Sequence, residues 1–246
     1  MAQELSGKAA LVTGGAQRIG RAIALALARG GADIAITYLE SERAAQRLAA
    51  EIEQLGRACA VFKCDVREQR SVEAMVRRVE ARFGGVDLLV NNAGWYETVA
   101  LADITPQQWD RALHINTRGP FLVARALVPA LTRRRGRIIN LGSLGGARPW
   151  VMHAQYCASK AALNMLTLIM AKALAPRVSV NCVAPGMIET RGKAGSALLG
   201  KIAAKTPMKR NGTPEEVAEA VLFFATATPF ITGQVLYVDG GLALAT

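Results

Sequence analysis

The sequence is poor in the residues that build metal sites and disulfide frameworks. It has two histidines and four cysteines, and the cysteines (Cys59, Cys64, Cys157 and Cys182) form no CxxC pair. Their neighbours are apolar residues of strand-like or helical segments. We therefore expect buried, reduced thiols in a cytoplasmic protein, and no metal ion.

Long apolar runs are also missing. No stretch approaches the roughly 20 uncharged apolar residues of a membrane span. The N-terminal "MAQELSGKAALV" lacks a basic region followed by a signal-like apolar segment. These absences argue against a membrane protein and against secretion.

Acidic residues are fewer than basic ones. The chain has 30 Lys and Arg against 19 Asp and Glu, which gives a net charge of +11. The basic residues are scattered, and the densest cluster, "TRRRGR" at 132–137, has no interleaved aromatic residues. This distribution does not favour nucleic-acid binding. The cluster fits either a solvated helix end or a surface that attracts an acidic partner or an anionic cofactor.

What the chain does have is a regular alternation of strand-like and helical segments over all 246 residues. Strands are expected at 9–13, 33–37, 58–63, 87–91, 137–141, 178–184 and 234–238. Helices are expected at 19–29, 41–55, 68–82, 106–134, 153–175 and 213–227. This order predicts one α/β domain, 1–246, with a doubly wound Rossmann architecture: a mainly parallel seven-stranded sheet with helices on both faces. The longest irregular piece is 185–212, within which 187–212 is the expected substrate loop.

The turn "TGGAQRIG" joins the first strand to the first helix. Glycines let the backbone approach a phosphate, and the N–H groups of the helix start face the anion. We expect Gly14, Ile19 and Gly20 to contact a dinucleotide.

An NAD-binding protein of this type carries Asp or Glu about 20 residues after the turn. Here the second strand ends in "ITYLES", with Tyr38 at that place and Ser41 nearby. A missing carboxylate, together with Arg18 in the turn, favours NADPH. The alternative is that Tyr38 only packs on adenine and discriminates nothing.

The segment "YCASK" places Tyr156 and Lys160 four residues apart, on one face of a helix. A free tyrosine has a pKa near 10, and a nearby ammonium lowers that pKa toward the working range of an acid–base catalyst. The pair alone also fits a solvated helix face. Further motifs follow other strands at their carboxyl ends, where open α/β sheets bind ligands: "NNAG" (91–94), "NLGS" (140–143) and "APG" (184–186).

With these motifs, the chain resembles the short-chain dehydrogenase/reductase family from "LSGKAALVTGG" to "ITGQVLYVDGG". The resemblance implies a catalytic tetrad of Asn116, Ser143, Tyr156 and Lys160. Tyr156 would protonate a carbonyl oxygen as hydride arrives from nicotinamide, and Ser143 would orient that oxygen. Lys160 would bind the nicotinamide ribose and lower the pKa of Tyr156, and Asn116 would hold a water.

The resemblance also implies further contacts. Asp65 and Val66 would contact adenine. The other implied cofactor contacts are Asn92, Ala93 and Gly94 for the ribose and diphosphate, and Pro185, Gly186, Ile188 and Thr190 for nicotinamide. Trp150, Met152 and His153 precede Tyr156 and are expected to line the substrate pocket. The family further implies a homotetramer, built from the helices at 106–134 and 153–175 and the C-terminal strand.

Within the family, the chain looks like a 3-oxoacyl-acyl-carrier-protein reductase, an NADPH-dependent enzyme acting on a small or carrier-bound carbonyl substrate. Arg133, Arg134 and Arg137 are then candidates to meet an acidic carrier protein. The alternative is a pteridine reductase, because that branch carries an arginine at the position of Arg18, although it typically has Asp in place of Ser143. A dinucleotide-binding regulator without turnover is a third possibility, which the tetrad disfavours.

Overall fold

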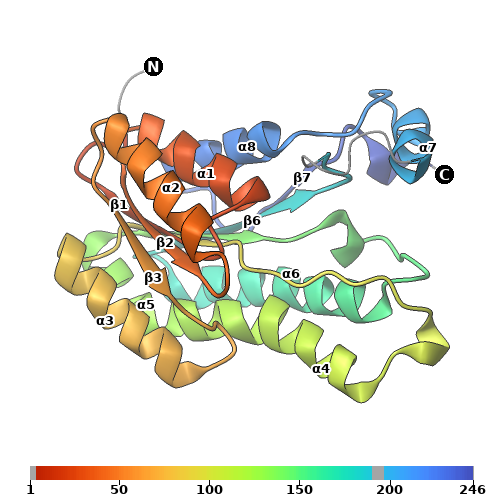
Figure 1. Cartoon of the computed structure of the whole chain (residues 1–246), viewed down its shortest axis with the longest axis horizontal. Coiled ribbons are helices and arrows are strands. Elements are labelled where there is room, and N and C mark those ends of the chain that lie inside the picture. The colour runs from red at the N-terminus through yellow and green to blue at the C-terminus, as the bar shows by residue number, and fades with distance from the viewer. Residues whose placement is uncertain (1–3, 190–196, 246) are drawn as a thin grey trace.

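The core of the protein is a parallel sheet of seven strands in the order β3-β2-β1-β4-β5-β6-β7. The computed structural model describes residues 4–189 and 197–245 (Figure 1). The strands are β1 (Ala9–Val12), β2 (Asp33–Tyr38), β3 (Cys59–Lys63), β4 (Leu88–Asn91), β5 (Arg137–Leu141), β6 (Ser179–Pro185) and β7 (Val235–Val238).

Helices cover both faces of this sheet (Figure 1). One face carries α1 (Arg18–Arg29), α2 (Glu42–Gln54) and α8 (Pro214–Thr226). The other carries α3 (Gln69–Phe83), α5 (Gly119–Arg134) and α6 (Ala154–Leu174). The predicted α/β class, the seven strands and the two helical layers are confirmed. The inner strands are covered on both sides and are apolar almost throughout, whereas β7 at the edge of the sheet is partly exposed.

The helix expected at 106–134 is interrupted. It consists of α4 (Pro106–Leu113), a π-helical segment (His114–Arg118) and α5. The start of α4 is a capping box, in which the side chains of Thr105 and Gln108 each accept from the other's backbone N–H. The π segment contains Asn116, so the interruption falls on an expected site residue, as is frequent for such segments.

The segment 185–212 is not irregular throughout, as the sequence analysis expected. It contains α7 (Ala197–Lys205), which was missed. The signal was short: Leu198 and Ile202 lie four residues apart, which is the spacing of one helical face. Ser41 stands at the N-cap of α2, but its side chain makes no capping hydrogen bond.

Helix α6 is the one helix, among those described, that is long and apolar enough to cross a membrane by length and composition. In the fold it packs against β6 and α4, and its Lys160 is buried. We therefore treat α6 as a helix of the folded domain.

A chain of buried polar side chains fixes α6 on the two central strands. Asn91 Nδ2 on β4 donates to Asn140 Oδ1 on β5 at 2.9 Å. Asn140 Nδ2 then donates to Thr167 Oγ1 on α6 at 2.8 Å, and that hydroxyl donates to the Leu163 carbonyl at 2.9 Å. Asn140 and Thr167 are fully buried. This series of hydrogen bonds sets the position of the helix that carries Tyr156 and Lys160.

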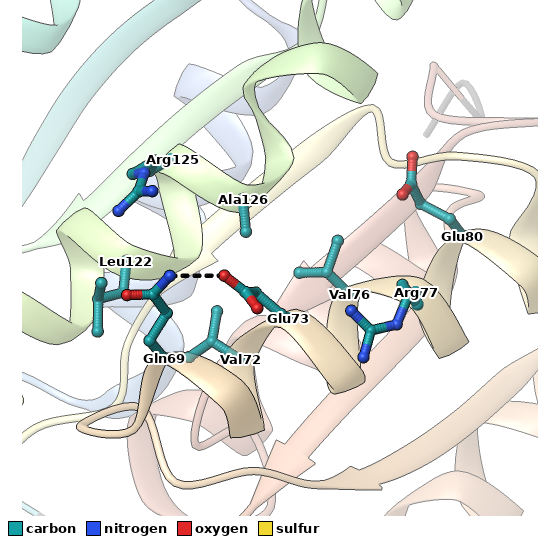
Figure 2. A pocket seen from close by; sticks show the side chains of 9 residues that line it. All are labelled: Gln69, Val72, Glu73, Val76, Arg77, Glu80, Leu122, Arg125 and Ala126. Carbon is teal, nitrogen blue, oxygen red and sulfur yellow. Dashed lines mark hydrogen bonds between the residues drawn. The ribbon is translucent and has the colours of Figure 1, made fainter.

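An open groove of about 320 Å³ lies between α3 and α5 (Figure 2). Its wall carries charges of both signs, from Glu73, Glu80, Arg77 and Arg125. Gln69 Nε2 donates to Glu73 Oε1 at 2.7 Å across one turn of α3. This hydrogen bond is exposed to solvent.

We predict that Asn140→Ala lowers the free energy of unfolding by about 1–3 kcal/mol, because it leaves the buried Asn91 amide without its acceptor. The control is Gln69→Ala, which removes an exposed hydrogen bond and should cost no more than about 0.5 kcal/mol. Urea unfolding of both variants checks this. Equal losses of unfolding free energy in the two variants would show that the buried hydrogen bonds contribute no more than the exposed one.

Candidate active site

Two loops that follow neighbouring strands are clamped together at the carboxyl edge of the sheet. Thr13 Oγ1, after β1, accepts from the backbone N–H groups of Asn92 and Ala93, after β4, at 3.0 Å each. Asn92 Nδ2 returns two hydrogen bonds, to the carbonyls of Thr13 (2.9 Å) and Gly14 (3.0 Å). Strand order reverses between β1 and β4, and open α/β sheets bind ligands at such a point.

The glycine-rich turn is packed too closely for other residues. Gly14 has a φ of +59°, and a Cβ there would lie 3.0 Å from Ala93 Cα. A Cβ on Gly20 would lie 2.5 Å from Asn92 Nδ2 and 2.6 Å from the Gly14 carbonyl oxygen. These glycines let the turn fold tightly against the loop after β4 at the start of α1, as a phosphate-binding turn requires.

Arg18 occupies a position that glycine would hold more easily. Its φ is +51°, in the left-handed region that costs an L-residue about 1–2 kcal/mol. The side chain is exposed and makes no hydrogen bond or ion pair with residues 4–189 or 197–245. The guanidinium is therefore free to bind an anion. Ile19, next along, is half-buried.

A carboxylate that was not predicted from the sequence lies close to the end of β2. Tyr38 is the last residue of β2 and is buried. Burial and a hydrogen bond to Glu42 raise the pKa of Tyr38. The first turn of α2 thus supplies an acidic group beside Tyr38, although the strand itself ends without one.

Ser143 lies beside Tyr156, close enough to affect the pKa of the phenol. Ser143 follows β5, and its Oγ accepts from the backbone N–H of Gly145 at 3.1 Å. Burial raises the pKa of Tyr156 to about 12, and the neighbouring Ser143 acts in the opposite direction. At neutral pH the phenol is therefore protonated and able to give a proton.

Lys160 is buried one helical turn after Tyr156. Its Nζ donates to the Leu141 carbonyl at 2.6 Å and lies 5.9 Å from the centre of the Tyr156 ring. Burial lowers the pKa of Lys160 to about 8. The ammonium donates to the Leu141 carbonyl, and the lowering of the Tyr156 pKa by Lys160 stays a prediction.

The side chain of Asn116 makes three hydrogen bonds with protein groups. Its Oδ1 accepts from the Trp95 N–H at 2.7 Å, and its Nδ2 donates to the Trp95 carbonyl and to Ser159 Oγ, both at 2.9 Å. Asn116 thereby holds the loop after β4 against α6. Its Oδ1 keeps a second acceptor position, and the implied water-holding role stays a prediction.

Aromatic rings surround Tyr156. Tyr96 meets the Tyr156 ring edge-on at 5.0 Å, and Trp150 stacks on it at 6.1 Å, between ring centres. His153 stacks on Tyr96 at 4.7 Å. The sequence analysis missed Tyr96, although two aromatic residues directly after "NNAG" are conspicuous in a chain with 5% aromatics.

The hydrogen bonds of His153 indicate which ring nitrogen carries the proton in the neutral ring. Its Nδ1 lies 3.0 Å from the Glu97 carbonyl oxygen, which can only accept, so Nδ1 carries the proton. Nε2 then accepts from the Tyr96 hydroxyl at 3.0 Å. Tyr96 is thus held in place beside the Tyr156 ring from a residue 57 positions away.

A cavity of about 490 Å³ opens beside these rings, within the usual size range of ligand pockets. The structure places Trp150, Met152 and His153 in its wall, where the sequence analysis expected them. The rest of the wall is Tyr96, Leu144, Arg148, Pro149, Val151, Met187, Leu198, Ile202, Lys205, Leu242 and Ala245.

The remaining expected cofactor contacts follow β3 and β6. Asp65 is paired with Arg67, with Oδ2 and Nη2 2.6 Å apart, and this pairing lowers the pKa of Asp65. Val66 is buried near Gly119.

Beyond Pro185, the last residue of β6, the backbone is held by two contacts: Gly186 N–H donates to the Val238 carbonyl at 2.9 Å, and Ile188 bridges to Gly212. Gly94 is exposed, and Thr190 lies outside the described residues.

The basic cluster at 132–137 lies at the edge of the sheet where β5 begins. Arg137 begins β5 and Ser143 follows its end, so the two are separated by about 20 Å of extended chain. Arg137 donates to the Phe224 carbonyl at 2.8 Å, and Arg133 pairs with Glu80 at 3.2 Å. Arg134 donates to the Gly84 carbonyl at 2.8 Å. A carrier-protein contact at this cluster stays a prediction.

Comparison with known proteins gives full-length matches. The family model described as Enoyl-(Acyl carrier protein) reductase matches residues 14–243. The 3-oxoacyl-[acyl-carrier-protein] reductase FabG of Staphylococcus epidermidis is 37% identical over 240 residues, which are 96% of this chain and 98% of that protein.

Solved structures agree. A dehydrogenase/reductase from Sinorhizobium meliloti 1021 superimposes with a TM-score of 0.94 at 36% identity, covering 98% of this chain and 97% of that one. A gluconate 5-dehydrogenase from Burkholderia cenocepacia J2315, solved in complex with NADP and tartrate, gives 0.92 at 36% identity, covering 99% and 98%.

Proposed function

Because the chain belongs to the short-chain dehydrogenase/reductase family, an oxidoreductase family that binds a nicotinamide dinucleotide, we propose that it is an NADPH-dependent carbonyl reductase of the 3-oxoacyl-acyl-carrier-protein reductase type. The observation that carries this proposal is the placement of Ser143 beside Tyr156, with the buried Lys160 one helical turn away and an apolar cavity next to them. A dinucleotide-binding regulator would need neither the protonated phenol nor the cavity. The same proposal places the protein in the cytoplasm.

The residues present fit the cofactor, because the clamped turn offers a glycine cradle that a Cβ at Gly14 or Gly20 would fill. NADPH, when bound, supplies the hydride. Tyr156 gives its phenolic proton to the carbonyl oxygen as negative charge develops there. Ser143 donates a hydrogen bond to the same oxygen and orients it. Lys160 keeps a cation near the phenolate that remains, which favours that charged form.

The preference for NADPH rests on Arg18. Its exposed, unpaired guanidinium stands at the start of α1, where a phosphate of the dinucleotide would lie. The carboxylate of Glu42 beside Tyr38 keeps its negative charge and would repel a 2′-phosphate, so the proposed preference requires Arg18 to outweigh it. The related gluconate 5-dehydrogenase was solved with NADP, which supports the same choice.

A pteridine reductase remains the second candidate for a specific reason. Tyr96 and Trp150 present ring faces and edges around Tyr156, and such a wall suits a flat heterocycle. Ser143, rather than Asp, ranks this candidate below the ketone reductase.

We also propose a homotetramer. Met165, Leu168 and Ile169 on α6 are between 42% and 56% exposed, and Phe121 on α5 is 42% exposed. Large apolar side chains gathered on neighbouring helices are typical of a surface that packs on a partner. Leu236 and Tyr237 on β7 are 37% and 39% exposed and would serve a second contact.

The chemical step is tested at Tyr156 and Ser143. Tyr156→Phe removes the proton donor and keeps the ring, so turnover of an acetoacetyl thioester should fall about 10²- to 10⁴-fold, with NADPH binding nearly unchanged. Ser143→Ala should lower kcat by about 10²- to 10³-fold, as loss of an oxyanion donor does. NADPH oxidation and fluorescence titration measure the two quantities. A Tyr156→Phe enzyme with more than a tenth of wild-type activity would refute the assignment.

Cofactor choice is tested at Arg18 and Tyr38. Arg18→Gly should not destabilise the fold, because glycine adopts a positive φ freely. It should raise the KM for NADPH by about ten- to a hundredfold while kcat on a ketone survives, because one charge-assisted contact is lost. Tyr38→Asp should narrow or invert the preference over NADH.

Equal wild-type affinities for NADPH and NADH would contradict the cofactor proposal. Wild-type reduction of dihydrobiopterin, lost in Arg18→Gly at saturating NADPH, would instead favour the pteridine reductase.

The oligomer is tested by light scattering at micromolar concentration. Wild type should have the mass of a tetramer, and Ile169→Glu should dissociate it, because a charge cannot be buried unpaired in the α6 contact. The matched control is Glu219→Lys on α8. A monomeric wild type would contradict the proposal.

A further inference from the structure

The cavity beside Tyr156 differs in charge from the groove between α3 and α5. The groove combines two glutamates with two arginines (Figure 2). Among the residues that the structure describes, the cavity wall contains Arg148 and Lys205 and no Asp or Glu. Its other members are apolar or aromatic side chains and His153. An anion in this cavity would meet two cations and no competing carboxylate.

Arg148 is held in position, yet its charge is not neutralised. The residue is exposed, and its Nη2 donates to the Ala243 carbonyl at 2.5 Å. A carbonyl oxygen accepts a hydrogen bond without removing the charge. Among the described residues Arg148 has no acidic partner, whereas Arg210 is paired with Glu216 at 2.5 Å.

Lys205 reaches the cavity from α7. Leu198 and Ile202 line the same cavity, and the three positions (198, 202 and 205) share one face of the helix. Lys205 is exposed and has no ion pair within residues 4–189 and 197–245. Helix α7 therefore adds both apolar surface and one positive charge to the cavity wall.

The part of the cavity beside Tyr156 is lined by aromatic rings rather than by these cations. Tyr96 and Trp150 line the cavity and also contact the Tyr156 ring, at 5.0 and 6.1 Å between ring centres. Apolar side chains such as Met152, Met187 and Leu198 make up much of the remaining wall. A ligand that matches the site beside Tyr156, the apolar wall and the two cations has a carbonyl, an apolar segment and an anionic group.

We propose that Arg148 and Lys205 bind an anionic group, a phosphate or a carboxylate, of a substrate whose carbonyl is reduced at Tyr156. This inference rests on the proposed reductase function and names the substrate class: ketones joined through an apolar segment to an anion. Arg148 and Lys205 act on binding and selectivity, and the proton donor remains Tyr156.

The test compares three methyl ketones that differ in the charged group they carry. Acetoacetyl-coenzyme A carries phosphates, the acetoacetyl thioester of N-acetylcysteamine is neutral, and 5-oxohexanoate carries a carboxylate on a short apolar chain. Wild type and Arg148→Gln, Lys205→Gln and the double variant are assayed with saturating NADPH. The matched control is Arg29→Gln, which removes one charge from the last turn of α1.

We expect each single variant to raise the KM for acetoacetyl-coenzyme A about tenfold, and the double variant to raise it further. The kcat for this substrate and the KM for the neutral thioester should not change. Arg148→Lys should recover part of the loss. The response of 5-oxohexanoate tells a carboxylate site from one selective for phosphate. Arg29→Gln should change nothing.

Two further measurements make the result independent of turnover of the charged substrate. Coenzyme A alone should inhibit reduction of the neutral thioester in wild type and lose that inhibition in the double variant. The affinity for NADPH, measured by fluorescence titration, should be unchanged. A weakened NADPH affinity would assign the two cations to the cofactor and overturn the inference.

Failure of this inference differs from failure of the proposed function. If the variants alter the charged and neutral thioesters equally, or not at all, the anion site is refuted while reductase activity stands. If wild type reduces none of the ketones with NADPH, the proposed function fails and the anion site falls with it.

Discussion

The clamp between Thr13 and Asn92 is the interaction on which the site depends. It joins the turn after β1 to the loop after β4, at the place where the strand order reverses. Because all strands are parallel, every loop that follows a strand emerges at the same edge. The clamp fixes two of these loops, and the Asn91–Asn140–Thr167 chain fixes the helix opposite them. Cofactor turn and catalytic helix are thus positioned by buried hydrogen bonds with few alternatives.

Burial acts in opposite directions on Tyr156 and Lys160. It raises the pKa of the phenol, which is neutral when protonated, and lowers the pKa of the amine, which is charged when protonated. The pair is therefore arranged to keep a proton on Tyr156 and to make the cation on Lys160 costly. The Leu141 carbonyl offsets part of that cost by accepting from Nζ at 2.6 Å. These opposite pKa shifts suit Tyr156 as a proton donor.

The sequence predicted the strands well because parallel strands buried on both faces are short, continuous apolar runs, such as "AALV" in β1. It predicted the positions of Tyr156 and Lys160 because their relation is local, one helical turn. It could not predict contacts made by tertiary structure. Tyr96 is positioned by His153 from far along the chain, and the Lys160 ammonium turns to a main-chain carbonyl.

Helix α7 was missed because its nine residues are too few for a clear amphipathic period. For a related reason the sequence did not place the basic cluster: a sequence shows that charges are close together but not which edge of the sheet they occupy.

The position of that cluster has an electrostatic consequence. In a parallel α/β domain the helices run back against the strands, so their C-terminal ends gather at the edge away from the catalytic residues. Each end carries roughly half a negative charge from aligned peptide dipoles. The last turns of four helices at that edge contain basic residues: Arg29 in α1, Arg82 in α3, Arg133 and Arg134 in α5, and Lys172 in α6. Much of the protein's excess positive charge therefore offsets its own backbone dipoles, while the helix N-termini leave the opposite edge positive toward an anionic cofactor.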